Sequence, residues 1–467
     1  MNAAAVETLE RIWAGGGKAH DAAPPDWREA IGEETGDEGE LRLLALVSQA
    51  ARVTLRSAPV DAPTRPDLPK LSLPTLPEPV RAAFRATVAP NAAAPLLAVE
   101  LLAARGWSAH PLDWMPGARG EAPALYRPWV EWQAGNAEAP EVLDEETWDE
   151  VTRAPRRMML HDLRLADPDA ARAVMEAKLA SRPAEERVEL VEVMRTGLSE
   201  ADADFLHSLA SDRSGKVKEE AARLLARLQR ADDGSADAAL IREVIGVETV
   251  GLLRRKRVFR PKRRPRSGGA RHEDIEALSG VTLSSLAVAL GTTNEAFIAG
   301  WNWNDNVMID GQIATIVANS ATDEEVQSFA ETCVEAGEPS HHTLAVLASR
   351  LTAGGWSRLV NRILASASDV QGSLVATLSE VPSEARALGT VPARKIAGSA
   401  LLPWLVEREG KRERYDYFMP DALAFLGLVA DREGAAFALD AMRKAGRPLA
   451  DPDLALLRLN ATLPHAS

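Results

Sequence analysis

Cysteine is almost absent, since Cys333 is the only one in 467 residues. A single thiol excludes an intramolecular disulfide framework and any zinc site built on paired thiolates. The sequence therefore predicts a protein of a reducing compartment, which we expect to be the cytoplasm.

Long apolar runs and an export signal are also missing. The longest apolar stretches, residues 41–47 and 281–290, fall short of the roughly 20 residues that span a bilayer. The N-terminus reaches Glu7 without a basic region or a long apolar core. We expect no membrane-spanning helix and no membrane partner.

Signatures of catalysis and metal binding are missing too. The sequence has neither an HExxH nor a GxSxG motif, and its eight histidines are scattered apart from His341 and His342. The glycines before Lys18 resemble a phosphate loop, but Ala19 stands where that loop needs a hydroxyl. We expect no catalytic residue, no metal and no cofactor, and a non-enzymatic protein. An enzyme whose carboxylate pair is hidden from sequence spacing stays open as an alternative.

What is present is the composition of α-helices. Aromatic residues make up 5% of the chain, whereas Ala, Leu, Arg and Glu recur in blocks separated by Gly, Pro or Asp. Helix-start signals recur at Asp167 before Pro168, at Ser199 with Asp202, and at Thr322 with Glu325. The sequence predicts an all-α fold.

One stretch resembles the second half of a HEAT repeat at Asp212, Val217, Lys218, Ala221, Ala222, Leu225 and Leu228. In that repeat an acidic and a basic residue form a polar ladder between successive units. The resemblance implies a HEAT-like, α-solenoid-like architecture with irregular Pro/Trp-rich connections. It also implies a structural ladder role for Asp212 and Lys218.

A longer resemblance spans roughly residues 77–230. It is carried by the runs HDLR at 161–164, DPDAAR at 167–172, EER at 185–187, GLS at 197–199 and DRS at 212–214. These runs resemble an uncharacterised bacterial all-helical family. Its members are encoded near MoxR-type AAA+ ATPases, von Willebrand A-domain proteins and SWIM zinc-finger proteins. The resemblance implies a fold and a context, and no catalytic residues.

The chain divides by composition into six segments. We expect N-terminal helices at 1–57, a Pro-rich connector at 58–79, a helical region with Trp/Pro-rich loops at 80–153, HEAT-like helical repeats at 154–235, a basic linker at 236–275 and a C-terminal helical domain at 276–467.

The basic linker holds the strongest charge contrast, because nine of the thirteen positions 254–266 are basic in a chain of net charge −14. These residues are Arg254, Arg255, Lys256, Arg257, Arg260, Lys262, Arg263, Arg264 and Arg266. The run could contact the protein's own acidic helices, an acidic partner protein or nucleic acid. It has a single aromatic residue, Phe259, so it lacks the stacking platform typical of single-strand binding.

A second unusual run is Trp301, Asn302, Trp303 and Asn304. Stacking and amide hydrogen bonds could make it a ligand pocket for a carbohydrate or a nucleotide. The alternative, which we favour, is a packed turn between helices.

These features together favour a non-enzymatic helical scaffold or adaptor that binds a partner protein. The partner that the resemblance implies is a MoxR-type AAA+ ATPase or an A-domain protein. The alternative function is a nucleic-acid-associated module that uses the basic run 254–266.

Overall fold

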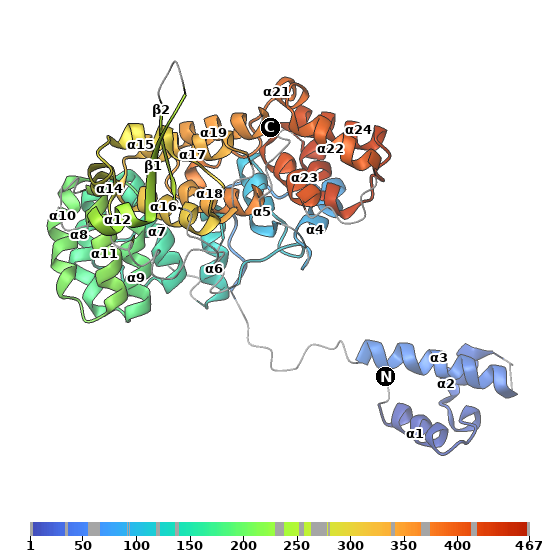
Figure 1. Ribbon diagram of the computed structural model, residues 1–467. Coiled ribbons are helices and arrows are strands. Elements are labelled where there is room, and N and C mark those ends of the chain that lie inside the picture. The colour runs from blue at the N-terminus through green and yellow to red at the C-terminus, as the bar shows by residue number, and fades with distance from the viewer. Residues whose placement is uncertain are drawn as a thin grey trace. The chain divides into compact units, whose positions relative to one another are not determined.

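The structure is a computed structural model (Figure 1). It describes residues 3–32, 36–54, 66–90, 92, 94–117, 122–135, 140–228, 238–251, 256–262, 278, 281–337, 341–365, 374–411 and 418–464. The chain divides into two compact units, Met1–Asp67 and Leu68–Ser467. The boundary between the units falls inside the stretch that the sequence predicts to be a Pro-rich connector.

The first unit is a small helical body with its own core. Its elements are α1 (Ala3–Ala14), η1 (His20–Ala22), α2 (Pro25–Ile31) and α3 (Gly36–Thr54). Gly16 has a φ of 74°, which lets the chain turn directly after α1. The buried side chains of Leu9, Ile31 and Leu43 close the core, and the Trp13 indole donates to Glu40 at 2.8 Å.

The second unit begins with helices on both sides of an irregular stretch. They are α4 (Glu78–Thr87), α5 (Pro95–Ala104), η2 (Ala124–Tyr126), α6 (Arg127–Gln133), α7 (Arg153–Ala166), α8 (Pro168–Lys178), η3 (Leu179–Ser181), α9 (Ala184–Val193), η4 (Glu200–Asp202), α10 (Ala203–Ser208), η5 (Leu209–Ser211) and α11 (Gly215–Leu228). The predicted start signals act as caps, since the Asp167 side chain accepts from the N–H of Ala170 at 3.0 Å. Ser199 and Asp202 form a capping box.

A β-hairpin follows these helices, and it lies in the segment 236–275 that the sequence predicts to be a basic linker. After α12 (Ala238–Val244), the strands β1 (Ile245–Val250) and β2 (Lys256–Pro261) pair antiparallel, with Val247 opposite Phe259. The physical reason is the burial of Ile245 and Phe259, which anchors the strands to the helices despite the charge between them.

The C-terminal half returns to helices. They are α14 (Leu283–Ala289), α15 (Asn294–Gly300), α16 (Val307–Ser320), α17 (Asp323–Glu335), α18 (His341–Ala348), α19 (Ala353–Ala365), α20 (Leu374–Glu380), η6 (Ser383–Ala385), α21 (Ala393–Ala397), α22 (Leu401–Lys411), α23 (Phe418–Val429), α24 (Arg432–Lys444), η7 (Pro452–Leu454) and α25 (Ala455–Thr462). Thr322 and Glu325 form the predicted capping box before α17.

Most helices of the second unit lie in two rows. One row runs in the order α7, α9, α11, α16, α18, α20, α23, α25 and α4, and each helix contacts the next. The other row runs through α15, α17, α19, α22 and α24. In the described part of the chain, β1 and β2 are the only paired strands longer than isolated bridges. The predicted all-α fold is therefore confirmed.

Two separate apolar cores lie inside the second unit. One is confined to the helices between Leu143 and Leu224. The other extends from Leu76 to Leu463 and joins the beginning of the unit to its end. At that end the Arg105 guanidinium donates to Asn460 at 2.8 Å. The seam between the two cores falls where α11 meets α16.

Candidate functional site

Three buried or nearly buried arginine pairs connect the helices between α7 and α11. They are Arg156 with Glu186, Arg164 with Asp202, and Arg187 with Asp212, and we call them the buried arginine pairs. Each joins a helix of the row to an element later in the chain. A buried ion pair is retained at low cost only when hydrogen bonds satisfy both partners, as they do here.

Arg164 on α7 is the centre of this network. Neither its side chain nor that of Asp202 is exposed to solvent. The two guanidinium Nη atoms donate to the two carboxylate oxygens of Asp202 at 3.0 and 2.9 Å. Remaining donors reach the carbonyls of Thr196 and Gly197, both at 2.9 Å. One arginine therefore holds the loop after α9 against the end of α7.

Gly197 shows why this loop needs its particular sequence. The residue has a φ of 59°, in the left-handed region that favours glycine. A Cβ there would lie 3.2 Å from the carbonyl oxygen of Arg164. The glycine of the GLS run at 197–199 therefore allows the loop backbone to approach α7 closely.

The predicted ladder residues have different surroundings. Asp212 accepts two hydrogen bonds from Arg187, at 3.1 and 2.7 Å, and one from the N–H of Ser214 at 2.7 Å. Burial raises the pKa of Asp212, but the Arg187 and Ser214 hydrogen bonds outweigh it and hold that pKa below its usual value. Lys218 is exposed on α11. The residue paired with Asp212 is Arg187, which the sequence analysis did not assign to the ladder.

The β1–β2 hairpin carries the described part of the basic run, namely Lys256, Arg257, Arg260 and Lys262. Arg257 donates to the carbonyls of Gly291 and Leu290 at the end of α14, at 2.6 and 2.8 Å. Its neighbours Arg254, Arg255, Arg263, Arg264 and Arg266 lie outside the described residues. Lys256 and Lys262 are exposed.

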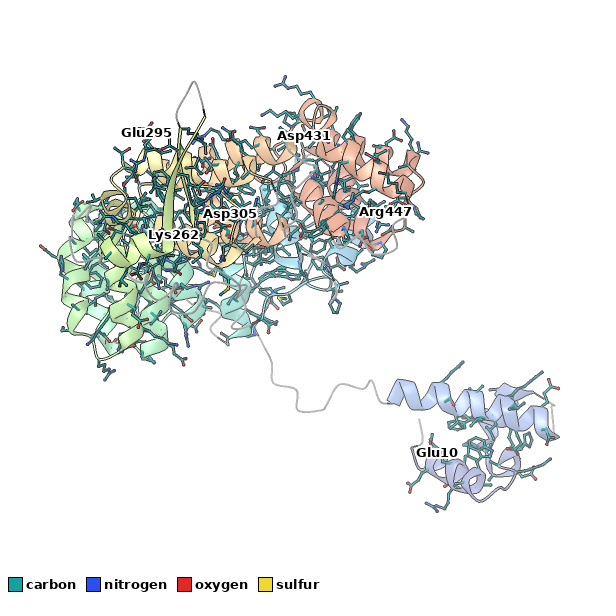
Figure 2. The ribbon with its side chains drawn as sticks, viewed as in Figure 1. Glu10, Lys262, Glu295, Asp305, Asp431 and Arg447 are labelled. Atoms are coloured by element: carbon teal, nitrogen blue, oxygen red, sulfur yellow. The ribbon has the colours of Figure 1, made fainter. Side chains whose placement is uncertain are left out.

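Arg260 is also held by the protein itself. It forms ion pairs with Glu248 on β1 and with Asp305, each with an N–O distance of 3.2 Å. Asp305 and Lys262 are labelled in Figure 2. Two of the four described basic residues are thus committed to contacts within the chain, which is one of the roles that the sequence left open.

The outer edge of β1 is the most open backbone of the hairpin. The N–H of Lys262 donates to the carbonyl of Val244 at 2.8 Å, which shows which residue pairs of the two strands are the hydrogen-bonded ones. Because inward and outward groups alternate along an antiparallel strand, the amide and carbonyl groups of Val247 and Thr249 face away from β2. Within the described residues, no strand pairs with this edge. Val247 and Val250 are 40% and 44% exposed.

Comparison with known proteins places these features in one region. Residues 109–277 match a family of unknown function, DUF5691. The DUF5691 match covers less than half of the chain and includes the buried arginine pairs and the hairpin. It confirms a resemblance to an uncharacterised family, but over a different span from the predicted 77–230: the match begins at residue 109 and continues beyond Arg230. Neither the curated proteins nor the solved structures include a significant match to the chain.

The tryptophan run lies outside the DUF5691 match, between α15 and α16. Trp301 is buried, and its indole N–H donates to Asp310 at 2.9 Å. Trp303 stacks near Phe329 with ring centroids 4.6 Å apart. The Asn304 amide donates to the carbonyl of Gly337 at 2.8 Å.

The indole N–H of Trp301 and the side-chain amide of Asn304 are thus already used within the chain, although a carbohydrate or a nucleotide would need them. Asn302 donates its backbone N–H to the carbonyl of Phe259 at 2.8 Å, which fixes the run to the hairpin. Asn304 has a φ of 68°, as expected for a turn residue. The geometry favours the packed turn over the ligand pocket.

The described residues contain no cluster of three His, Cys, Asp or Glu side chains arranged to hold a metal ion. Cys333 is buried, and burial raises the pKa of its thiol. Among the same residues, no helix combines the length and the apolar character needed to cross a membrane.

The open edge of β1 is the feature that sequence reasoning missed within the DUF5691 match. The signal was available in residues 245–250, IGVETV, where β-branched residues are dense. The adjacent basic run led to the prediction of a linker, and the strand signal was overlooked.

Proposed function

We propose that the protein is a non-enzymatic helical scaffold that binds a partner protein, and that the β1–β2 hairpin is the contact. The single observation that carries this proposal is the unpaired outer edge of β1. Edge strands of natural proteins are usually short, covered or protected by charge, because an open edge recruits other strands. Here residues 247–250 are all exposed.

The chemistry of this edge fits addition of a strand from a partner. An extended peptide would pair with the backbone groups of Val247 and Thr249, and main-chain hydrogen bonds would supply the affinity. The exposed side chains of Val247 and Val250 lie on opposite faces of the strand, so they would contact the added strand from both of its faces. The only charged residue of β1, Glu248, is already paired with Arg260.

The basic side chains favour an acidic protein partner over nucleic acid. Arg257 and Arg260 are engaged with the chain itself, which leaves Lys256 and Lys262 exposed among the described basic residues. Two lysines offer few of the phosphate contacts on which nucleic-acid affinity depends. They are sufficient to favour an acidic strand.

The resemblance stated above supplies the class of partner. We propose a MoxR-type AAA+ ATPase, or the A-domain protein of such a system, as the protein that docks on the hairpin. A row of stacked helices beside the hairpin is a suitable rigid support for such an adaptor.

The test is a binding measurement between the purified full chain and the AAA+ ATPase and A-domain protein of its own host. Val247→Pro removes an N–H that faces away from β2, so no β1–β2 hydrogen bond is lost. Proline is tolerated at such edge positions of a sheet. We expect it to weaken binding at least tenfold. Val247→Thr, which keeps the backbone edge, is the matched control and should change affinity little.

Two results would contradict the proposal. Unchanged affinity of Val247→Pro would show that the edge of β1 is not the contact. Binding of nucleic acid at about 50 mM salt that is lost at about 200 mM, and abolished by replacing the basic run with serine, would favour the nucleic-acid function instead.

A further inference from the structure

A pocket of about 330 Å³ lies at the seam between the two cores of the second unit. Its walls come from α11, α16, α18 with the two residues that follow it, the end of α20 and Arg195 after α9. Four arginines and two glutamates line it: Arg195, Arg223, Arg227, Arg350, Glu220 and Glu380. Glu192 and Asp323, next to the lining, pair with Arg195 and Arg350, so acidic and basic side chains balance in this region.

Three of the four arginines have acidic partners. Glu220, nearly buried, pairs with Arg195 at 3.3 Å and with Arg223. Arg350 pairs with Asp323, with an Nε–Oδ1 distance of 3.1 Å, and donates to the carbonyls at the end of α16. The positive charge of these residues is largely compensated within the protein.

Arg227 near the end of α11 is different. Its side chain is half-buried, and its Nε atom is fully buried without a hydrogen-bond partner. No ion pair joins it to any described carboxylate. Burial, together with the nearby Arg350 and Arg195 charges, lowers the pKa of Arg227 to about 10.

The buried Nε–H of Arg227 calls for an explanation, because leaving a donor of a charged group unpaired in a desolvated place costs stability. A guanidinium offers a planar fork of donors that matches a carboxylate or a phosphate. Among the four pocket arginines, Arg227 is the one without a described acidic partner, so its guanidinium is the group that would pair with the phosphoryl oxygens of a phosphate monoester, an anion at neutral pH.

The rest of the pocket indicates the size of the ligand. Alongside the charged groups, its lining includes the apolar side chains of Leu224 and Val346. The volume is at the lower end of that of pockets for organic ligands and exceeds what a single inorganic ion needs.

We propose that this pocket binds a small organic phosphate monoester, with the phosphoryl group against Arg227 and the organic part against Leu224 and Val346. This inference is independent of partner binding at the hairpin. It concerns α11, α16 and α18 and uses no residue of β1 or β2.

The experiment is calorimetric titration of the full-length chain at constant ionic strength. The probes are AMP, glucose 6-phosphate, inorganic phosphate and citrate. Arg227→Met keeps the volume of the side chain and removes its charge, and we expect it to weaken binding of the organic phosphate at least tenfold. Arg227→Lys keeps the charge but loses the fork, so its affinity should fall between the two.

The matched control is Arg394→Met on α21. Arg394 is exposed and makes no ion pair within the described part of the chain, so its loss should leave affinity unchanged. The melting temperature of Arg227→Met without ligand should be equal to or above that of the parent chain, because the unpaired charge is gone. That measurement also verifies that the variant folds.

Several results would overturn the proposal. The parent chain could bind none of the phosphates, or Arg227→Met could bind them as tightly as the parent chain. Arg394→Met could also lose as much affinity as Arg227→Met. Binding of citrate alone would overturn the phosphate assignment. Inorganic phosphate bound as tightly as both organic phosphates would overturn the role given to the apolar wall.

Discussion

Replacing Arg164 by methionine should selectively destabilise the helices between α7 and α11. Methionine retains much of the side-chain volume but removes every donor, so Asp202 becomes a fully buried carboxylate that has lost its main partner. The carbonyls of Thr196 and Gly197 also lose their donor. The remaining partners of Asp202 are Arg172, at 3.2 Å, and its own capping box.

The magnitude follows from the environment. Removing one partner of a buried ion pair typically costs about 3–5 kcal/mol, because the other charge stays buried without compensation. The retained contact from Arg172 places the expected loss at about 3–4 kcal/mol. Such a loss is large against the roughly 5–15 kcal/mol by which a domain is stable.

The assay is amide hydrogen exchange of the native protein, read by mass spectrometry on peptides from α7 to α11. The matched control is Arg153→Met on the same helix, whose partner Glu189 is 37% exposed. Exposed pairs contribute about 1 kcal/mol or less. We expect protection in α7–α11 to fall at least a hundredfold for Arg164→Met and less than tenfold for the control. Similar, small changes in both variants would refute the argument.

Three further predictions follow from titratable and paired residues. Asp162 and Glu384 raise the pKa of His161 to about 9. The stability that the charged imidazole contributes is therefore complete below about pH 6.5 and is lost as the pH rises through 9. His161→Gln should abolish this pH dependence of the unfolding free energy, measured by urea titration. Burial raises the pKa of Asp310 to about 6. The stability that its protonated form contributes should therefore be complete below about pH 4 and fall by about 3 kcal/mol as the pH rises to about 6. Asp310→Asn should remove this dependence in thermal melts. Asp212→Ala should lower the unfolding free energy by about 3 kcal/mol, whereas Lys218→Ala should change it by less than about 0.5 kcal/mol, as measured by urea titration. Equal effects of the two substitutions would support the predicted ladder between Asp212 and Lys218.

The sequence predicted most of the helical architecture because its signals are local. Caps such as Asp167 and Thr322 act within three residues of the helix they begin, and the apolar period of α11 is readable in one stretch. The all-α class follows from such signals summed along the chain.

The residues that are joined across the fold were harder to predict. Asp212 was identified as a ladder residue, but its partner Arg187 is 25 residues earlier, and the choice of Lys218 rested on the usual repeat pattern. The pocket brings Arg227 and Arg350 together from helices that no local pattern connects. The hairpin was missed because the density of basic residues around Arg257 and Arg260 indicated a linker, whereas buried Phe259 decides the local structure.

The buried arginine pairs limit where this region can be recombined with related proteins. Arg156 reaches forward to Glu186, Arg164 to Asp202 and Arg187 to Asp212, so the spans that they bridge overlap. Any recombination crossover between residues 156 and 212 therefore draws at least one arginine and its carboxylate from different parent proteins. Unless both parents carry the same pair, this leaves a buried charge uncompensated, so this stretch should pass between proteins as a single block.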